Sequence, residues 1–149
     1  NHSSGAAAQE EQHGLCRANP SAAQPKYADG GVEPHPPGAV AGQSAGAWIA
    51  LMLCLNPRYL NALNLSPLDI SGWIIDSAQT TSHFNVIKRE RGENPLLQRI
   101  DEYAPLYYVD ENTRFTRMLL MFYREDMPCR PEQNRLFARV VFTFNQNAN

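Results

Sequence analysis

The chain has 149 residues, of which 43% are hydrophobic and 19% are charged, and its formal net charge is −2. This length and composition are those of about one globular domain with a sizeable core, and they exclude disorder of the whole chain. A charge this small excludes the strong electrostatic field with which proteins collect nucleic acid or anionic membranes. We therefore expect neither partner. The longest apolar run, at 45–55, is also too short to span a bilayer.

The first forty residues differ in composition from the rest. Residues 1–40 are rich in Ala, Gly, Ser and Pro and hold few large apolar side chains. Such a segment buries too little surface to offset the entropy of ordering it, so we expect a flexible, low-complexity arm. The folded domain is then expected at 41–149. His2, His13 and His35 fall in the arm at irregular spacing, which is typical of solvated histidines.

The domain begins with GQSAG at 42–46, and the apolar run AGAWIALMLCL at 45–55 follows at once. A run that is apolar on every side predicts a helix packed inside a layered domain, and Asn56-Pro57 ends it. Further on, the short apolar run Trp73-Ile74-Ile75 predicts a buried parallel strand. The polar, mixed stretch 80–99 is expected to be a loop with at least one helical turn.

The last third of the chain predicts three more elements. Residues 100–109 predict a short helix broken at Pro105, and RMLLMFYR at 117–124 is the strongest strand pattern in the chain. A helix is expected next, because Pro131 suits a first turn and Glu132 complements the helix dipole. Its apolar face would comprise Leu136, Phe137, Val140, Val141 and Phe144. Strands alternating with helices predict a parallel α/β sheet, in which functional groups gather beyond the carboxyl ends of the strands.

Ser44 lies where a nucleophile elbow would have its serine, between two glycines and directly before the apolar helix. A serine on a sharp strand-to-helix turn has a strained backbone and needs tiny residues two positions away, and Gly42 and Gly46 meet this need. The amide of Ala45 would donate to a developing oxyanion. Two alternatives stay open: GxSxG arises often by chance, and a flexible Gly/Ser hinge has the same sequence. Only residues 39–41 are available for the strand that leads into the elbow.

Asp126 follows the strongest strand pattern, in a turn where a triad acid would lie. Such an acid orients a histidine and stabilises its imidazolium form. The chain order Ser then Asp fits the order Ser, Asp, His of hydrolases with a nucleophile elbow. Glu125 and Asp76 compete with it by the same logic, and an ordinary solvated turn aspartate is the remaining alternative.

These segments resemble α/β-hydrolase-fold esterases and lipases, particularly the small carboxylesterase and acyl-hydrolase group. The resemblance rests on GQSAGAWIALMLCLNPRYL at 42–60, ISGWIIDSAQTTSHFNV at 70–86, IDEYAPLYYV at 100–109 and LLMFYREDMPCRPEQNRLF at 119–137. It implies a partial α/β-hydrolase fold, a parallel sheet with helices on both faces. It also implies hydrolysis of a small-molecule ester through an acyl-enzyme on Ser44. Ala45 is then one oxyanion donor and Asp126 the acid, and no metal or organic cofactor is implied.

The chain departs from that family at two points. The family's histidine follows the helix after the acid, whereas no histidine follows His83 here. The HGG-type motif that supplies a second oxyanion donor is absent from residues 1–40. His83 itself is more typical of a substrate-lining or solvated residue than of a general base. We therefore expect a fragment with impaired activity. Two alternatives are a non-catalytic remnant that serves as a binding module and an unrelated scaffold whose elbow is coincidental.

The remaining expectations concern cysteines, charges and edges. Cys16, Cys54 and Cys129 lie far apart without CxxC spacing, so no zinc site is expected, and Cys54 should be buried in the apolar run. An odd cysteine count without a disulfide framework favours the cytoplasm but leaves the localisation open. The run Lys88-Arg89-Glu90-Arg91 is expected on a solvated face. A sheet without its first strands would expose unpaired edges, which favours self-association.

Overall fold

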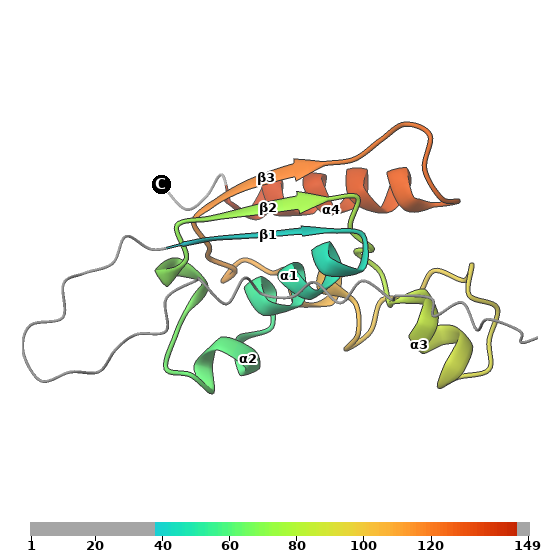
Figure 1. Cartoon of the computed structure of the whole chain (residues 1–149), viewed down its shortest axis with the longest axis horizontal. Coiled ribbons are helices and arrows are strands. Elements are labelled where there is room, and N and C mark those ends of the chain that lie inside the picture. The colour runs from blue at the N-terminus through green and yellow to red at the C-terminus, as the bar shows by residue number, and fades with distance from the viewer. Residues whose placement is uncertain (1–37, 146–149) are drawn as a thin grey trace, which may run out of the picture. The chain divides into compact units, whose positions relative to one another are not determined.

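The computed structural model describes residues 38–145 and is shown in Figure 1. The expected arm at 1–40, with Cys16 and three of the four histidines, lies almost wholly outside the described residues. The elements, in chain order, are β1 (Ala39–Gln43), α1 (Ala45–Leu55), α2 (Pro57–Asn61), the 3₁₀ turn η1 (Pro67–Asp69), β2 (Gly72–Asp76), α3 (Phe84–Arg89), the 3₁₀ turn η2 (Pro105–Tyr108), β3 (Arg117–Met121) and α4 (Arg130–Asn145).

The three strands form one parallel sheet in the order β1-β2-β3. Val40 pairs with Trp73, and Trp73 pairs with Met118, so these three side chains share one face. The prediction of a parallel α/β arrangement with flanking helices is therefore confirmed. The outer edges of β1 and β3 pair with no strand within residues 38–145. Self-association through these edges stays a prediction.

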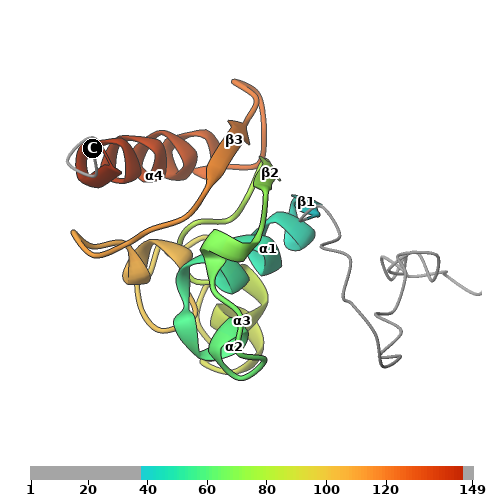
Figure 2. The same cartoon turned by 90° about the vertical axis from the view of Figure 1, so that its left-hand side faces the viewer.

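The helices of the described chain cover one face of the sheet. Trp73 and Ile75 are buried in a core that also contains Leu51 of α1 and Phe137 of α4. On the opposite face, the exposed apolar side chains include Ile74 at 39%, Leu119 at 54% and Met121 at 38%. Figure 2 shows α1 and α4 on the same side of the sheet.

The expectation of helices on both faces is thus wrong for the described residues. The reason is topological. Each crossover, from β1 to β2 and from β2 to β3, steps to the next strand in the same direction. Right-handed crossovers that step in one direction bring all their connecting segments to one face. The sequence pattern predicts the strands and helices. It does not predict which face the helices cover, because that depends on the strand order.

The helix predicted at 45–55 is present with those bounds as α1. Its buried side chains are Ala47, Ala50, Leu51, Met52, Cys54 and Leu55. Ile49 is 53% exposed, so the helix is not buried on every side. It ends at Asn56, whose side chain accepts a hydrogen bond from the amide of Arg58 and caps α2, and Pro57 fits the first position of that helix. The burial predicted for Cys54 is confirmed.

The elements of the last third differ from the predictions in their lengths. β3 ends at Met121, three residues before the end of the predicted strand. The helix predicted at 100–109 is reduced to η2, which Pro105 begins rather than breaks, because its ring fits a first turn. In α4 the apolar face is confirmed at Phe137, which is fully buried, whereas Leu136 is 47% exposed.

Candidate functional site

Ser44 forms the turn between β1 and α1, at the carboxyl end of the edge strand β1. Its backbone has φ 51° and ψ −113°, a region that residues with a side chain seldom adopt, at a cost of about 1–3 kcal/mol. The amide of Ser44 donates to the carbonyl of Asp76 at 2.9 Å, and its carbonyl accepts from the amide of Trp48 at 3.0 Å. The side chain is exposed and caps no helix amide. The strained conformation thus presents a free hydroxyl at the sheet edge.

The glycine two residues before Ser44 is required by a close backbone approach. A Cβ added at Gly42 would lie 2.3 Å from the carbonyl oxygen of Gly46 and 2.7 Å from the amide nitrogen of Ala47. No real Cβ tolerates such contacts, so any other residue at 42 would push α1 away from β1. A Cβ added at Gly46 would meet nothing within 4 Å. The steric demand of the turn therefore falls on Gly42.

The backbone at the start of α1 supplies one donor for an oxyanion. Ala45 is the first residue of the helix, so its amide has no intrahelical acceptor. The dipole of this 11-residue helix also favours negative charge at that end. Ser44 and Ala45 together thus offer a hydroxyl and an adjacent amide donor.

The three acidic candidates at the sheet edge differ in their surroundings. Asp126 lies in the exposed loop after β3, and its Oδ1 accepts from the amide of Met127 at 2.6 Å. Glu125 is exposed beside it. Asp76 ends β2 and is partly buried, with Oδ1 buried and without a hydrogen-bond partner in the described chain. Among residues 38–145, no hydrogen bond or ion pair joins any of the three to a histidine.

His83 is buried, at 8% exposure, and is therefore not a solvated histidine. Its Nδ1 accepts from the amide of Asn85 at 3.2 Å and caps α3. The ring stacks on Phe84 at 4.5 Å and meets the edge of Trp48 at 5.2 Å. Burial lowers the pKa of His83, and the positive charge of Arg130 lowers it further.

These contacts assign a tautomer to His83. The lowered pKa favours the neutral ring at pH 7. Because Nδ1 accepts the capping hydrogen bond, the proton is assigned to Nε2. A ring in this state donates from Nε2 and has no free lone pair to take a proton from Ser44. His83 is thus unsuited to be the general base in this arrangement.

The segment Ser77–His83 between β2 and α3 is buried at every residue, although six of its seven residues, all but Ala78, are polar or ionisable. The hydrogen-bond partners of this segment come mainly from α4 and from residues 98–106. The amide and hydroxyl of Thr80 bond to Gln133, at 3.1 Å to Oε1 and 3.0 Å to the carbonyl, and Asn134 Nδ2 donates to the carbonyl of Ala78 at 2.8 Å. Sequence reasoning took residues from 80 onward as a loop. The signal that it missed is the absence of charge in SAQTTSH.

Arg130 is a buried residue near the candidate site that the sequence pattern did not indicate. It is 3% exposed, and its Nη1 donates to the carbonyl of Ser77 at 2.6 Å. Burial lowers the pKa of Arg130, while the charge of Asp126 raises it. Ser77 itself has φ 49°, and its amide donates to the carbonyl of Met121 at 2.8 Å. The acceptor lies 53 residues from Arg130 in the chain, which explains why local sequence gave no sign of it.

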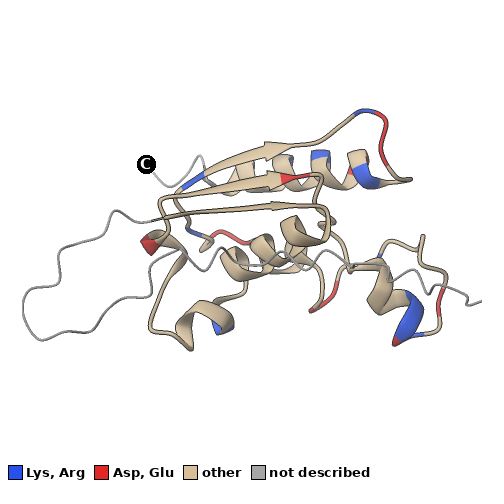
Figure 3. Ribbon diagram, in the orientation of Figure 1, with Lys and Arg blue, Asp and Glu red and all other residues tan. Residues whose placement is uncertain are grey.

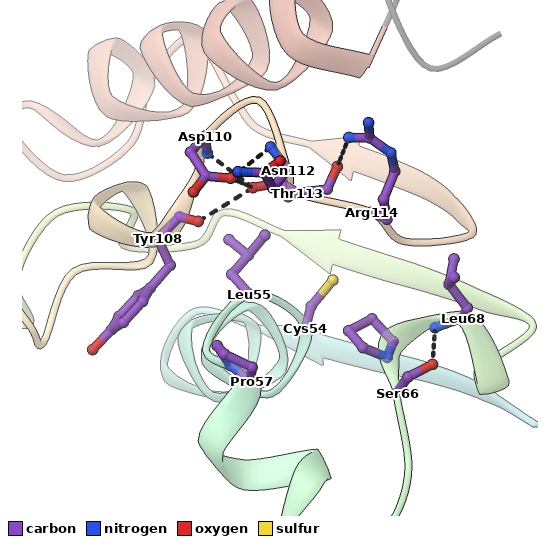
Figure 4. A pocket seen from close by; sticks show the side chains of 11 residues that line it. Cys54, Leu55, Pro57, Ser66, Leu68, Tyr108, Asp110, Asn112, Thr113 and Arg114 are labelled. Atoms are coloured by element: carbon purple, nitrogen blue, oxygen red, sulfur yellow. Dashed lines mark hydrogen bonds between the residues drawn. The ribbon is translucent and has the colours of Figure 1, made fainter.

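A cavity of about 350 Å³ lies at the other end of α1, away from Ser44. Figure 4 shows side chains from α1 and from the loops before β2 and β3 around it, including Cys54, Leu55, Leu68, Asp110 and Arg114. Burial raises the pKa of the Cys54 thiol to about 12, so this thiol is a poor nucleophile. The cavity therefore contributes no group to the chemistry of the elbow.

Within the described residues, no group of three or more His, Cys, Asp or Glu side chains is arranged to hold a metal ion. In that same part of the chain, every helix is too short or too polar to cross a membrane. Figure 3 shows acidic and basic residues interspersed along the ribbon.

Comparisons of the chain with protein-family models, with curated proteins and with solved structures found no match.

Proposed function

We propose that the chain is a serine carboxylic-ester hydrolase with a partial α/β-hydrolase fold, acting through an acyl-enzyme on Ser44. The observation that carries this proposal is the strained backbone of Ser44 at a strand-to-helix turn, at φ 51°. Gly42 makes the close approach that this turn requires. A linker serine has no need of such strain, whereas a nucleophile gains an exposed hydroxyl beside a helix amide.

The chemistry would run in two steps. The Oγ of Ser44 attacks the ester carbonyl carbon, and the Ala45 amide stabilises the oxyanion at the start of α1. The bond between the carbonyl carbon and the alcohol oxygen then breaks, and the alcohol leaves with the serine proton. Water hydrolyses the resulting acyl-enzyme in the same way. Asp126 is the proposed acid that orients a general base, and the substrate class is a small-molecule ester.

A second candidate is a non-catalytic module that binds acyl ligands or a partner. The observation that favours it concerns the base. In the described residues, His83 uses Nδ1 to cap α3, and Asp126 bonds to its own loop. Without a base, catalysis by a triad enzyme falls to a residual of about 10³–10⁴-fold over water. The two candidates therefore differ in whether Ser44 is reactive at all.

Chemical rescue would separate these candidates. Hydrolysis of p-nitrophenyl acetate would be measured with the wild-type chain at increasing concentrations of free imidazole, which supplies a base. We expect a Ser44-dependent rate that rises with imidazole and is lost in Ser44→Ala. Ser71→Ala is the matched control, because Ser71 is exposed at the amino end of β2. Equal rates for wild type and Ser44→Ala at every imidazole concentration would favour the non-catalytic module.

A further inference from the structure

We propose that Arg130 is a positioning residue of this site, which fastens the loop that carries Asp126 to the end of β2. The catalytic meaning of this role rests on the proposed esterase function. The fastening itself rests on the contacts of the arginine and is testable without activity.

The loop at 122–129 has little else to hold it. All its residues are exposed except Phe122, which is partly buried. Asp126 bonds only within the loop, to the amide of Met127. Arg130, the next residue, is by contrast almost fully buried, at 3% exposure. The position of the Asp126 carboxylate is thus decided by the point at which the loop enters the core.

Arg130 stands where the loop 122–129 ends. Its side chain binds the residue after β2, and two further contacts join Arg130 to the loop. Its Nη1 donates to the carbonyl of Ser77 at 2.6 Å, directly after β2. Its Nη2 lies 3.7 Å from the Sδ of Met127, and its amide donates to the carbonyl of Met127 at 3.0 Å. One side chain therefore holds the residue next to Asp126 against the end of β2.

The same end of β2 also holds the elbow. The carbonyl of Asp76 accepts from the amide of Ser44 at 2.9 Å, and Asp76 precedes Ser77. A continuous series of contacts thus runs from Ser44 through Asp76 and Ser77 to Arg130, and from there to the loop. Fixing the loop to this series fixes the proposed acid relative to the proposed nucleophile.

The buried charge of Arg130 has an energetic cost that a neutral side chain making the same hydrogen bond would not have. Within residues 38–145 no carboxylate oxygen lies within 4 Å of its guanidinium, so the buried cation has no ion pair. Removing such a cation from water carries a large desolvation penalty, which a neutral side chain would avoid. The Asp126 carboxylate is close enough for its charge to act on Arg130. The positive charge of Arg130 attracts the Asp126 carboxylate toward the sheet edge, whereas a neutral side chain would not.

The first test measures backbone amide hydrogen exchange in wild type, Arg130→Gln and Arg130→Lys. In Arg130→Gln we expect exchange at 122–129 to rise about tenfold or more, with β1 and the first turn of α1 unchanged. Arg130→Lys, which keeps the charge and is the more conservative change, should give a smaller rise in the same segment. Arg139→Gln is the matched control, since Arg139 is exposed on the same helix. Unchanged exchange at 122–129, or a uniform rise over the whole chain, would overturn the proposal.

The second test measures Ser44-dependent ester hydrolysis by the same variants at fixed imidazole. We expect kcat to fall about tenfold in Arg130→Gln with KM unchanged, and partial recovery in Arg130→Lys, because misplacement of a catalytic group lowers turnover rather than binding. A loss that appears in KM alone would contradict the positioning role. If the wild type shows no Ser44-dependent rate, the proposed function fails. The exchange measurement would still decide whether Arg130 fastens the loop.

Discussion

At the carboxyl edge of the sheet, Ser44 is fixed by its own backbone, whereas Asp126 depends on a side chain that reaches across to another strand. The elbow is built mainly by residues 42–46, whose glycine contact and strained turn position its serine, with one backbone hydrogen bond to Asp76 of β2. The loop 122–129, which carries Asp126, is exposed and is followed by the buried Arg130. The side chain of Arg130 donates to the carbonyl of Ser77, 53 residues away in the chain. The difference teaches that the proposed nucleophile is specified mainly by local sequence, while the position of the proposed acid is specified by tertiary contacts.

The largest expected effect tests the local side of this comparison. Gly42→Ala would bring a Cβ to 2.3 Å from the Gly46 carbonyl oxygen, so β1 and α1 must separate. We expect the free energy of unfolding to fall by about 3 kcal/mol. Urea denaturation followed by circular dichroism would measure it. Gly46→Ala is the matched control and should be neutral or stabilising by up to about 1 kcal/mol, because its Cβ meets nothing and alanine favours helix. Equal losses in both variants would contradict the elbow geometry.

The next effect tests the tertiary side. Thr80→Val removes the hydroxyl that donates to the Gln133 carbonyl at 3.0 Å inside the buried segment. The free energy of unfolding should fall by about 1–2 kcal/mol, because a buried acceptor is left without its donor. Thr143→Val removes an exposed hydroxyl bond within α4 and should change stability by less than about 0.5 kcal/mol. A loss in Thr80→Val no larger than in Thr143→Val would show that α4 does not hold this segment.

A smaller effect of opposite sign is expected at the elbow itself. Ser44→Gly allows φ 51° without a Cβ, so it should raise the free energy of unfolding by about 1 kcal/mol. The entropy that glycine adds to the unfolded chain offsets part of the relief. Thermal and urea unfolding would both report the gain, with Ser71→Gly as the control that should lose stability. A destabilised Ser44→Gly would mean that the turn is not strained.

The smallest effect concerns the protonation of His83. Its pKa is lowered in the folded state, mainly by burial, so the unfolded chain binds a proton more readily. Stability from this group is therefore fully present above its ordinary pKa of about 6.5 and is lost as pH falls through the folded pKa. His83→Asn keeps an acceptor for the α3 cap without titrating there. As the pH falls from 7 to 5, the urea midpoint should decrease more steeply in wild type than in His83→Asn. Equal slopes would contradict the claim that protonation of His83 destabilises the fold.

The part of the fold that could be predicted from the sequence is the part carried by local pattern. The apolar run at 45–55 and the Trp73-Ile74-Ile75 run identify α1 and β2, because periodicity and capping act within a few residues. The single covered face was not predictable in this way, since it follows from strand order and crossover handedness. Arginine is seldom buried, yet Arg130 is 3% exposed, and its side-chain acceptor is the carbonyl of Ser77, 53 residues away in the chain. Polar residues of 77–83 are likewise buried because α4 and residues 98–106 supply their hydrogen-bond partners.

The measurement that tests the central claim most directly is covalent labelling of the chain with a fluorophosphonate, followed by peptide mapping. A fluorophosphonate reacts with an activated serine hydroxyl, which displaces fluoride and forms a stable phosphonate ester. With imidazole present, the account predicts one adduct, on the peptide that contains Ser44, and none in Ser44→Ala. Adducts spread over exposed serines such as Ser71, or no adduct at any pH, would contradict the claim that this turn is a nucleophile elbow.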